Sequence, residues 1–183
     1  VCHLYIDKFA DVKKAVAILV NGKTQKPSAC NAFETLLIHQ DIVEQFLPLA
    51  VEALKEFDVK IHACQRSLSY FEQAQLATEE DYHMEYLAQE IAIKVVDSYQ
   101  TAIDHINEYT SDHTEVIVSQ DTSRTQQFIR QINSSVVMVN ASSRFSDGGQ
   151  LGLGSEIGIS TSKLHAYGPM GLSALTTEKF IVL

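Results

Sequence analysis

The feature that most constrains the fold is a repeated alternation of short apolar runs with amphipathic segments. Strand-like runs cover residues 2–7, 34–39, 59–64, 90–97, 114–121 and 134–140. Between them, apolar residues recur at helical spacing, as in 12–19 and again in 98–109, where Ala102, Ile103 and Ile106 face one way. This order predicts an α/β fold with a largely parallel sheet flanked by helices. The length, 183 residues, suits one domain with a substantial core.

Three connecting segments need separate predictions. Asp41 can cap a helix that runs through 42–57, and Pro48 inside this segment predicts a helix start or a kink at the proline. The segment 66–76 has the pattern of a short helix, and the acidic stretch 77–85 that of a solvated loop.

Composition and charge exclude several classes of partner. The formal net charge is −9, which argues against binding to nucleic acid or to an anionic membrane surface. Three cysteines, Cys2, Cys30 and Cys64, do not form a disulfide framework, so a reducing cytosol is expected. No apolar run reaches transmembrane length and no signal-peptide pattern opens the chain. Because both ends lie in apolar runs and no initiator Met is present, we expect a piece of a larger protein.

The C-terminal stretch differs from the rest because seven of the eight glycines fall between Gly148 and Gly171. Its "GLGSEIG" is close to a dinucleotide-binding fingerprint, but that fingerprint follows the first strand and opens a helix, which is not expected here. His62 and Cys64 have the spacing of half a metal site. No second pair of ligands is visible, so we interpret both as core or surface residues and predict no metal.

Cys30, in the segment "KPSACNAF", is the cysteine with the most informative surroundings. Free cysteine is among the most buried residue types, which favours a small core residue. The polar, turn-forming neighbours favour instead a thiol held at the boundary between two elements, where hydrogen-bond donors can activate it. These local features leave both interpretations open.

Three longer segments, "NGKTQKPSACNAFETLLIHQDI", "VVDSYQTAIDHINEYTSDHTEVIV" and the stretch from "VMVNASSRF" to "EKFIV", resemble γ-glutamyl phosphate reductases of the aldehyde dehydrogenase superfamily. The resemblance covers nearly the whole chain. It implies that residues 1–183 form the cysteine-bearing catalytic domain of an aldehyde dehydrogenase-like fold. It also implies that an N-terminal NADP-binding domain would precede Val1, so that the isolated piece is expected to be inactive.

The resemblance also assigns roles to individual residues. Cys30 matches the catalytic nucleophile, and Glu85 resembles the acid that in many members binds the nicotinamide ribose, although Leu87 and Ala88 depart from the usual Gly-Pro. Asn140 resembles a strand end that lines the substrate side. Arg144 is then a candidate for gripping a substrate carboxylate or phosphate, with a structural ion pair as the alternative.

The function implied is NADPH-dependent reduction of L-glutamyl 5-phosphate to L-glutamate 5-semialdehyde and phosphate through a cysteine thioester, in proline biosynthesis. The implied partners are a glutamate 5-kinase domain or protein and further copies of the chain as a homo-oligomer. The implied location is the cytoplasm, or the mitochondrion for a bifunctional animal synthase. The alternatives are another acylating aldehyde dehydrogenase, or an inactive α/β domain that serves binding or oligomerisation.

Overall fold

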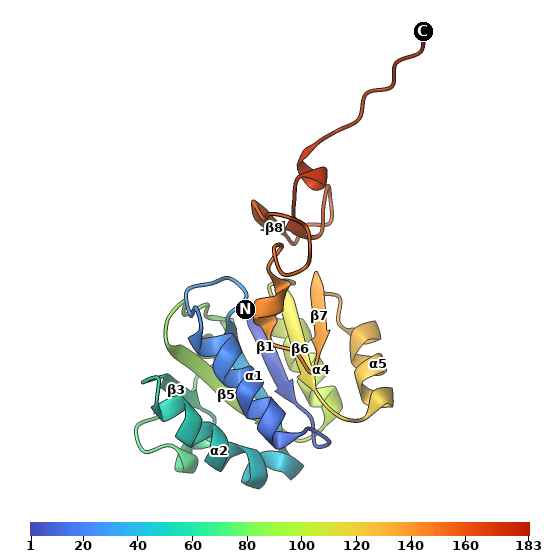
Figure 1. Ribbon diagram of the computed structural model, residues 1–183. Coiled ribbons are helices and arrows are strands. Elements are labelled where there is room, and N and C mark those ends of the chain that lie inside the picture. Colours follow the sequence, from blue (N-terminus) through green and yellow to red (C-terminus); the bar gives the residue numbers. More distant parts are fainter.

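The computed structural model describes residues 1–183 and shows one large sheet covered by helices, with a C-terminal arm that extends away from it (Figure 1). The strands are β1 (Cys2–Ile6), β2 (Phe33–His39), β3 (Lys60–Ala63), β4 (Gln75–Leu76), β5 (Glu90–Val96), β6 (Thr114–Val118), β7 (Val136–Val139), β8 (Gly158–Ser160) and β9 (Gly168–Met170). The helices are α1 (Val12–Thr24), α2 (Val43–Lys55), α3 (Glu79–His83), α4 (Tyr99–Tyr109) and α5 (Thr122–Gln131).

The large sheet has seven strands in the order β4-β3-β5-β2-β1-β6-β7, and every neighbouring pair is parallel. The predicted α/β fold with a parallel sheet is therefore confirmed. Helices α1 and α2 pack on one face and α4 and α5 on the other. Because both faces are covered, strand residues alternate between two cores: Leu4 and Ile6 join the first, and Tyr5 between them joins the second.

Several predicted element boundaries are wrong. Helix α2 begins at Val43 and runs through Pro48, and Asp41 lies in a separate 3-10 turn instead of capping α2. Within 66–76 the chain forms only a 3-10 turn at Leu68–Tyr70 and the edge strand β4.

The stretch predicted as a solvated loop contains the short helix α3. Its start is fixed because the backbone N–H of Thr78 donates to the Asp81 carboxylate at 2.7 Å. Its end is fixed by Tyr82, which is buried against α4.

Because the strands are parallel, all their amino ends lie along one edge of the sheet and all their carboxyl ends along the opposite edge. The amino ends of β2, β5 and β6 lie at one edge, together with the turn that carries Cys30 and the loop that carries Glu85. The opposite edge carries the residues that follow each strand, among them Asp7, Ser119 and Asn140. The arm with β8 and β9 rises beyond the amino edge in Figure 1. None of the helices has the length and apolar composition needed to cross a membrane.

Candidate active site

The thiol of Cys30 is exposed in the turn that joins α1 to β2, whereas Cys2 is buried and Cys64 half-buried. Two successive backbone hydrogen bonds shape this turn, from Ala29 N–H to the Lys26 carbonyl at 3.0 Å and from Ala32 N–H to the Ala29 carbonyl at 2.9 Å. The structure thus favours the interpretation of Cys30 as a thiol at an element boundary, and the buried alternative is wrong.

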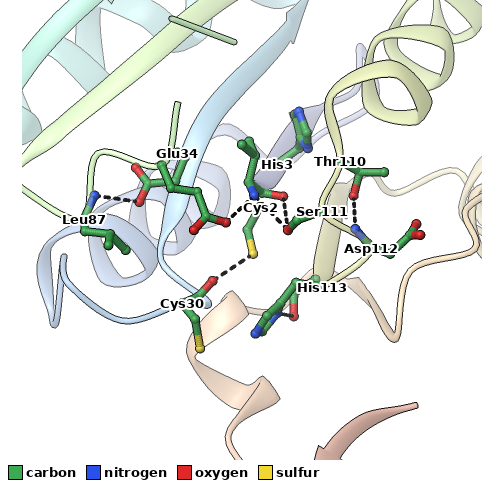
Figure 2. A network of polar contacts seen from close by, with 12 residues as sticks. Cys2, His3, Cys30, Glu34, Leu87, Thr110, Ser111, Asp112 and His113 are labelled. Atoms are coloured by element: carbon green, nitrogen blue, oxygen red, sulfur yellow. Dashed lines mark hydrogen bonds and ion pairs between the residues drawn. The ribbon is translucent and has the colours of Figure 1, made fainter. Parts of the chain in front are cut away.

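The buried strand β1 supports the turn from below. The Cys2 thiol donates to the carbonyl oxygen of Cys30, with 3.3 Å between Sγ and O, and in Figure 2 the Cys30 sulfur points away from Cys2. Helix α1 approaches the start of β2 closely at Gly22, where an added Cβ would lie 2.1 Å from the ring of Phe33. The turn is therefore held between β1 and α1, and the absence of a side chain at Gly22 lets α1 approach this closely.

Arg144 lies beside this turn and is held by neutral partners. It belongs to a 3-10 turn, Ser143–Ser146, that follows β7 and packs near α1. Its Nη1 donates to the side-chain oxygen of Asn31, and its Nε donates to Oε1 of Gln25 at 3.1 Å. No carboxylate lies within 4.0 Å of the guanidinium nitrogens, so the ion-pair alternative for Arg144 is wrong.

The guanidinium opens onto a surface pocket of about 290 Å³. The pocket is lined by Phe145 and by polar or charged side chains from α1 and from the segment after β7: Asn21, Gln25, Arg144, Asp147 and Gln150. A carboxylate or phosphate group that entered this pocket would meet the free N–H groups of Arg144.

The surroundings of Cys30 favour its neutral thiol. Partial burial raises the pKa of Cys30, and the carboxylates of Glu156 and Glu85 raise it further. The backbone N–H of Cys30 and the positive charge of Arg144 act in the opposite direction. A thiolate at this site is therefore opposed by burial and two nearby acids, and is stabilised first by the backbone N–H of Cys30 and then by the positive charge of Arg144.

Glu85 lies at the same edge as Cys30. Its carboxylate is half-exposed and its Oε1 lies 2.6 Å from the backbone nitrogen of Val1. The loop that carries it is anchored two residues later, because the N–H of Leu87 donates to Glu34 at 3.2 Å (Figure 2). Glu34 in turn forms a buried ion pair with Lys23 at 2.8 Å.

Asn140 is not brought together with Cys30. It ends β7 at the opposite edge of the sheet with a φ of 53°, a backbone conformation that asparagine tolerates. Its Oδ1 accepts from Ser119 N–H at 3.0 Å and its Nδ2 donates to the Ser119 carbonyl at 2.9 Å. Both ends of the amide thus join β7 to the segment after β6.

The glycine-rich segment does not have the structure of a dinucleotide fingerprint. Gly152 and Gly154 adopt positive φ values of 80° and 77°, and the short strand β8 follows them instead of a helix. The segment folds back on itself, because Glu156 accepts the N–H of Gly148 at 2.8 Å. Glu156 is also one of the carboxylates that raise the pKa of Cys30.

His62 and Cys64 have separate partners. The His62 ring lies 2.9 Å from Asp81 through Nδ1 and stacks on Tyr86 at 5.2 Å. The Cys64 sulfur accepts the N–H of Val95 at 3.3 Å, and no group of three His, Cys, Asp or Glu side chains has the geometry to hold a metal ion.

Asn31, Gln25 and the Lys23–Glu34 pair were missed at the sequence level. Its position directly after Cys30 is the only sequence signal for Asn31, because its burial is visible only in the structure. Gln25 and Lys23 lie at a helix C-terminus, where sequence favours a solvated side chain.

Comparison with known proteins first defines the class. No protein-family model matches the chain. A propionaldehyde dehydrogenase from Clostridium phytofermentans superposes on 96% of the chain and 48% of its own length, with a TM-score of 0.70 at 15% identity. The fold is therefore that of part of an aldehyde dehydrogenase.

Other relatives show to which particular proteins the chain is similar. The chain is 77% identical over 183 residues to the gamma-glutamyl phosphate reductase of Colwellia psychrerythraea. A crystal structure of gamma-glutamyl phosphate reductase from Thermotoga maritima matches the whole chain with a TM-score of 0.94 at 47% identity. In both cases the chain spans 44% of the relative's length. The resemblance to gamma-glutamyl phosphate reductases is thus confirmed along the entire chain.

Proposed function

We propose that residues 1–183 are the cysteine-bearing catalytic domain of an enzyme that reduces L-glutamyl 5-phosphate to L-glutamate 5-semialdehyde and phosphate, in proline biosynthesis. The observation that carries this proposal is the exposed Cys30 thiol in a turn whose next residue, Asn31, accepts a hydrogen bond from the guanidinium of Arg144, in a chain so similar to gamma-glutamyl phosphate reductases.

The chemistry begins with the sulfur of Cys30. After its proton has passed to water, the thiolate attacks the carbonyl carbon of the acyl phosphate, so that a C–S bond forms and the C–O bond to phosphate breaks. Phosphate leaves with the electron pair of that bond, and the acyl group remains on Cys30 as a thioester. The backbone N–H of Cys30, which lowers the pKa of the thiol, is our candidate donor for the developing oxyanion.

Arg144 suits the anionic substrate. An acyl phosphate of glutamate carries a phosphate and a carboxylate, and a planar guanidinium binds either group with two parallel hydrogen bonds. Because its present partners are amide oxygens, the guanidinium keeps its full charge for this purpose. We assign Asn140, which uses its amide at the other edge of the sheet, to holding β7 in place.

The proposed cofactor is NADPH, which supplies a hydride when bound. The residues present fit one part of it: the half-exposed carboxylate of Glu85 is a suitable acceptor for a ribose hydroxyl at the edge that carries Cys30. The "GLGSEIG" segment does not fit a pyrophosphate, because it opens no helix. We therefore propose that the main NADP-binding domain lies outside residues 1–183 and that this chain alone does not catalyse reduction.

A chimera tests this function. The chain would replace the matching segment of the Colwellia psychrerythraea relative. A glutamate 5-kinase would generate L-glutamyl 5-phosphate in the assay mixture, and the oxidation of NADPH would be measured. We expect turnover that Cys30→Ala abolishes and that Cys64→Ser, at a half-buried position outside the site, preserves. Turnover retained in Cys30→Ala, or activity only with other acyl donors, would contradict the proposal.

A second role, self-association, is supported by the arm. Large apolar side chains are exposed along it: Leu151, Leu153, Ile157, Leu164, Leu172, Leu175, Phe180, Ile181, Val182 and Leu183. Apolar surface of this extent favours an interface with further copies of the chain. Sedimentation of the chain with and without residues 147–183 tests this role, and a monomer in both cases would refute it.

A further inference from the structure

Asn31 connects the turn that carries Cys30 to the guanidinium of Arg144. It directly follows Cys30, its exposed fraction is only 3%, and its side chain contacts two residues that lie more than a hundred positions away in sequence. We infer that Asn31 is a positioning residue that holds the Arg144 guanidinium beside Cys30 without neutralising its charge. This inference rests on the proposed function, because the anion expected to bind Arg144 is the phosphate or the carboxylate of the substrate.

Hydrogen bonds fix the orientation of the Asn31 amide. A guanidinium has only donors, so the atom of Asn31 that faces Arg144 is the oxygen. The Nδ2 group then donates to Oγ of Ser146 at 3.0 Å, and that hydroxyl donates to the carbonyl of Ser143 at 2.8 Å. The two serines belong to the same 3-10 turn as Arg144, so one buried amide orients both the turn and the guanidinium.

The choice of an amide has an electrostatic consequence. A carboxylate at this position would hold the guanidinium equally well but would cancel its charge and leave no net attraction for an incoming anion. An amide oxygen orients Arg144 and leaves the charge in place. Only two of the five guanidinium N–H groups are used, one on Asn31 and one on Gln25, and the others remain for a ligand.

The exposed thiol provides a direct probe of this charge. Iodoacetate and iodoacetamide both alkylate the thiolate, and they differ in that the first is an anion. The ratio of their rates at Cys30, measured in the 183-residue chain by mass spectrometry of the peptide that contains it, therefore reports local positive charge. A change in the thiol pKa alters both rates equally and cancels in the ratio.

Four variants separate the possible outcomes. We expect Asn31→Asp to lower the ratio about fivefold by neutralising Arg144, as Arg144→Gln does by removing the charge. Asn31→Ala, which releases the guanidinium, should lower it by about two- to threefold. Asn107→Asp, the same change at an exposed position of α4, should leave the ratio as in the wild type.

A reduced ratio in Arg144→Gln combined with a wild-type ratio in Asn31→Asp and Asn31→Ala would overturn the inference. Because Asn31→Asp retains the size and the acceptor of the native side chain, it remains informative if Asn31→Ala does not fold. The alkylation ratio requires neither NADPH nor the acyl phosphate. The variants can therefore refute the role of Asn31 while the chimera is active, and they can support that role while the proposed reaction is wrong.

Discussion

The buried ion pair between Lys23 and Glu34, near the turn that carries Cys30, gives the sharpest stability prediction. The Lys23 side chain is fully buried, that of Glu34 is 3% exposed, and their charged atoms lie 2.8 Å apart. In Lys23→Met, Glu34 would keep only the Leu87 N–H as a partner. Since removing one member of a buried pair leaves an uncompensated charge, we expect a loss of about 3–5 kcal/mol in the free energy of unfolding at pH 7.5.

The pH dependence of this variant follows from the same burial. Burial already raises the pKa of Glu34, and Lys23 opposes that shift. Without Lys23 the folded-state pKa rises further above its unfolded value, so the folded state binds the proton more tightly. The variant should therefore regain stability relative to the wild type as the pH falls from 7.5 towards 5.5. Urea denaturation followed by circular dichroism at both pH values measures the change.

Two further variants make the test specific. Lys23→Met combined with Glu34→Gln removes both charges and should recover most of the loss. Lys60→Met breaks a pair with Glu90 of the same length, 2.8 Å, but Lys60 is about half-exposed, so the loss should stay below about 1 kcal/mol. Equal losses for Lys23→Met and Lys60→Met, or no recovery in the double variant, would refute the argument from burial.

Two other predictions concern a close contact and a buried imidazole. Gly22→Ala gains about 1 kcal/mol of helix propensity but forces the Phe33 ring to move, so a net loss of about 1–2 kcal/mol is expected, and a raised melting temperature would contradict it. Burial, and after it the electrostatic influence of His3 and Lys94, lowers the pKa of His105 to about 2. The imidazole therefore stays neutral in the folded chain while it gains a proton in the unfolded one, so between pH 6.5 and 5.0 stability should fall by up to about 2 kcal/mol through this group. Denaturation across that range should show a flatter slope for His105→Phe, and an unchanged slope would contradict this cause.

The sheet was predictable because its central strands are nearly continuous apolar runs, a pattern that burial on both faces requires. Short elements were not, because local contacts decide them. The start of α3 depends on the hydrogen bond from Thr78 N–H to Asp81, in a stretch whose sequence is typical of an acidic surface loop. Helix α2 continues through Pro48, and its buried side chains pack against the core.

The candidate site was predictable only in part for a similar reason. Cys30 and Arg144 could be named from sequence, but their proximity depends on how the chain returns from β7 towards α1, which no local pattern encodes. Asn140 appeared equivalent to Arg144 in sequence, yet it lies at the other edge of the sheet, where it bonds Ser119. The burial of Lys23 was likewise hidden, since a lysine near a helix end is usually solvated.

The most direct test of the proposed chemistry is the covalent state of Cys30 during reaction. The chimera would be supplied with L-glutamyl 5-phosphate in the absence of NADPH, and the peptide that contains Cys30 analysed by mass spectrometry. The expected result is a glutamyl adduct on Cys30 that hydroxylamine removes and that is absent from Cys30→Ala. An unmodified Cys30 in a preparation that reduces the substrate once NADPH is added, or an adduct on Cys64 instead, would contradict the assignment of Cys30 as the nucleophile.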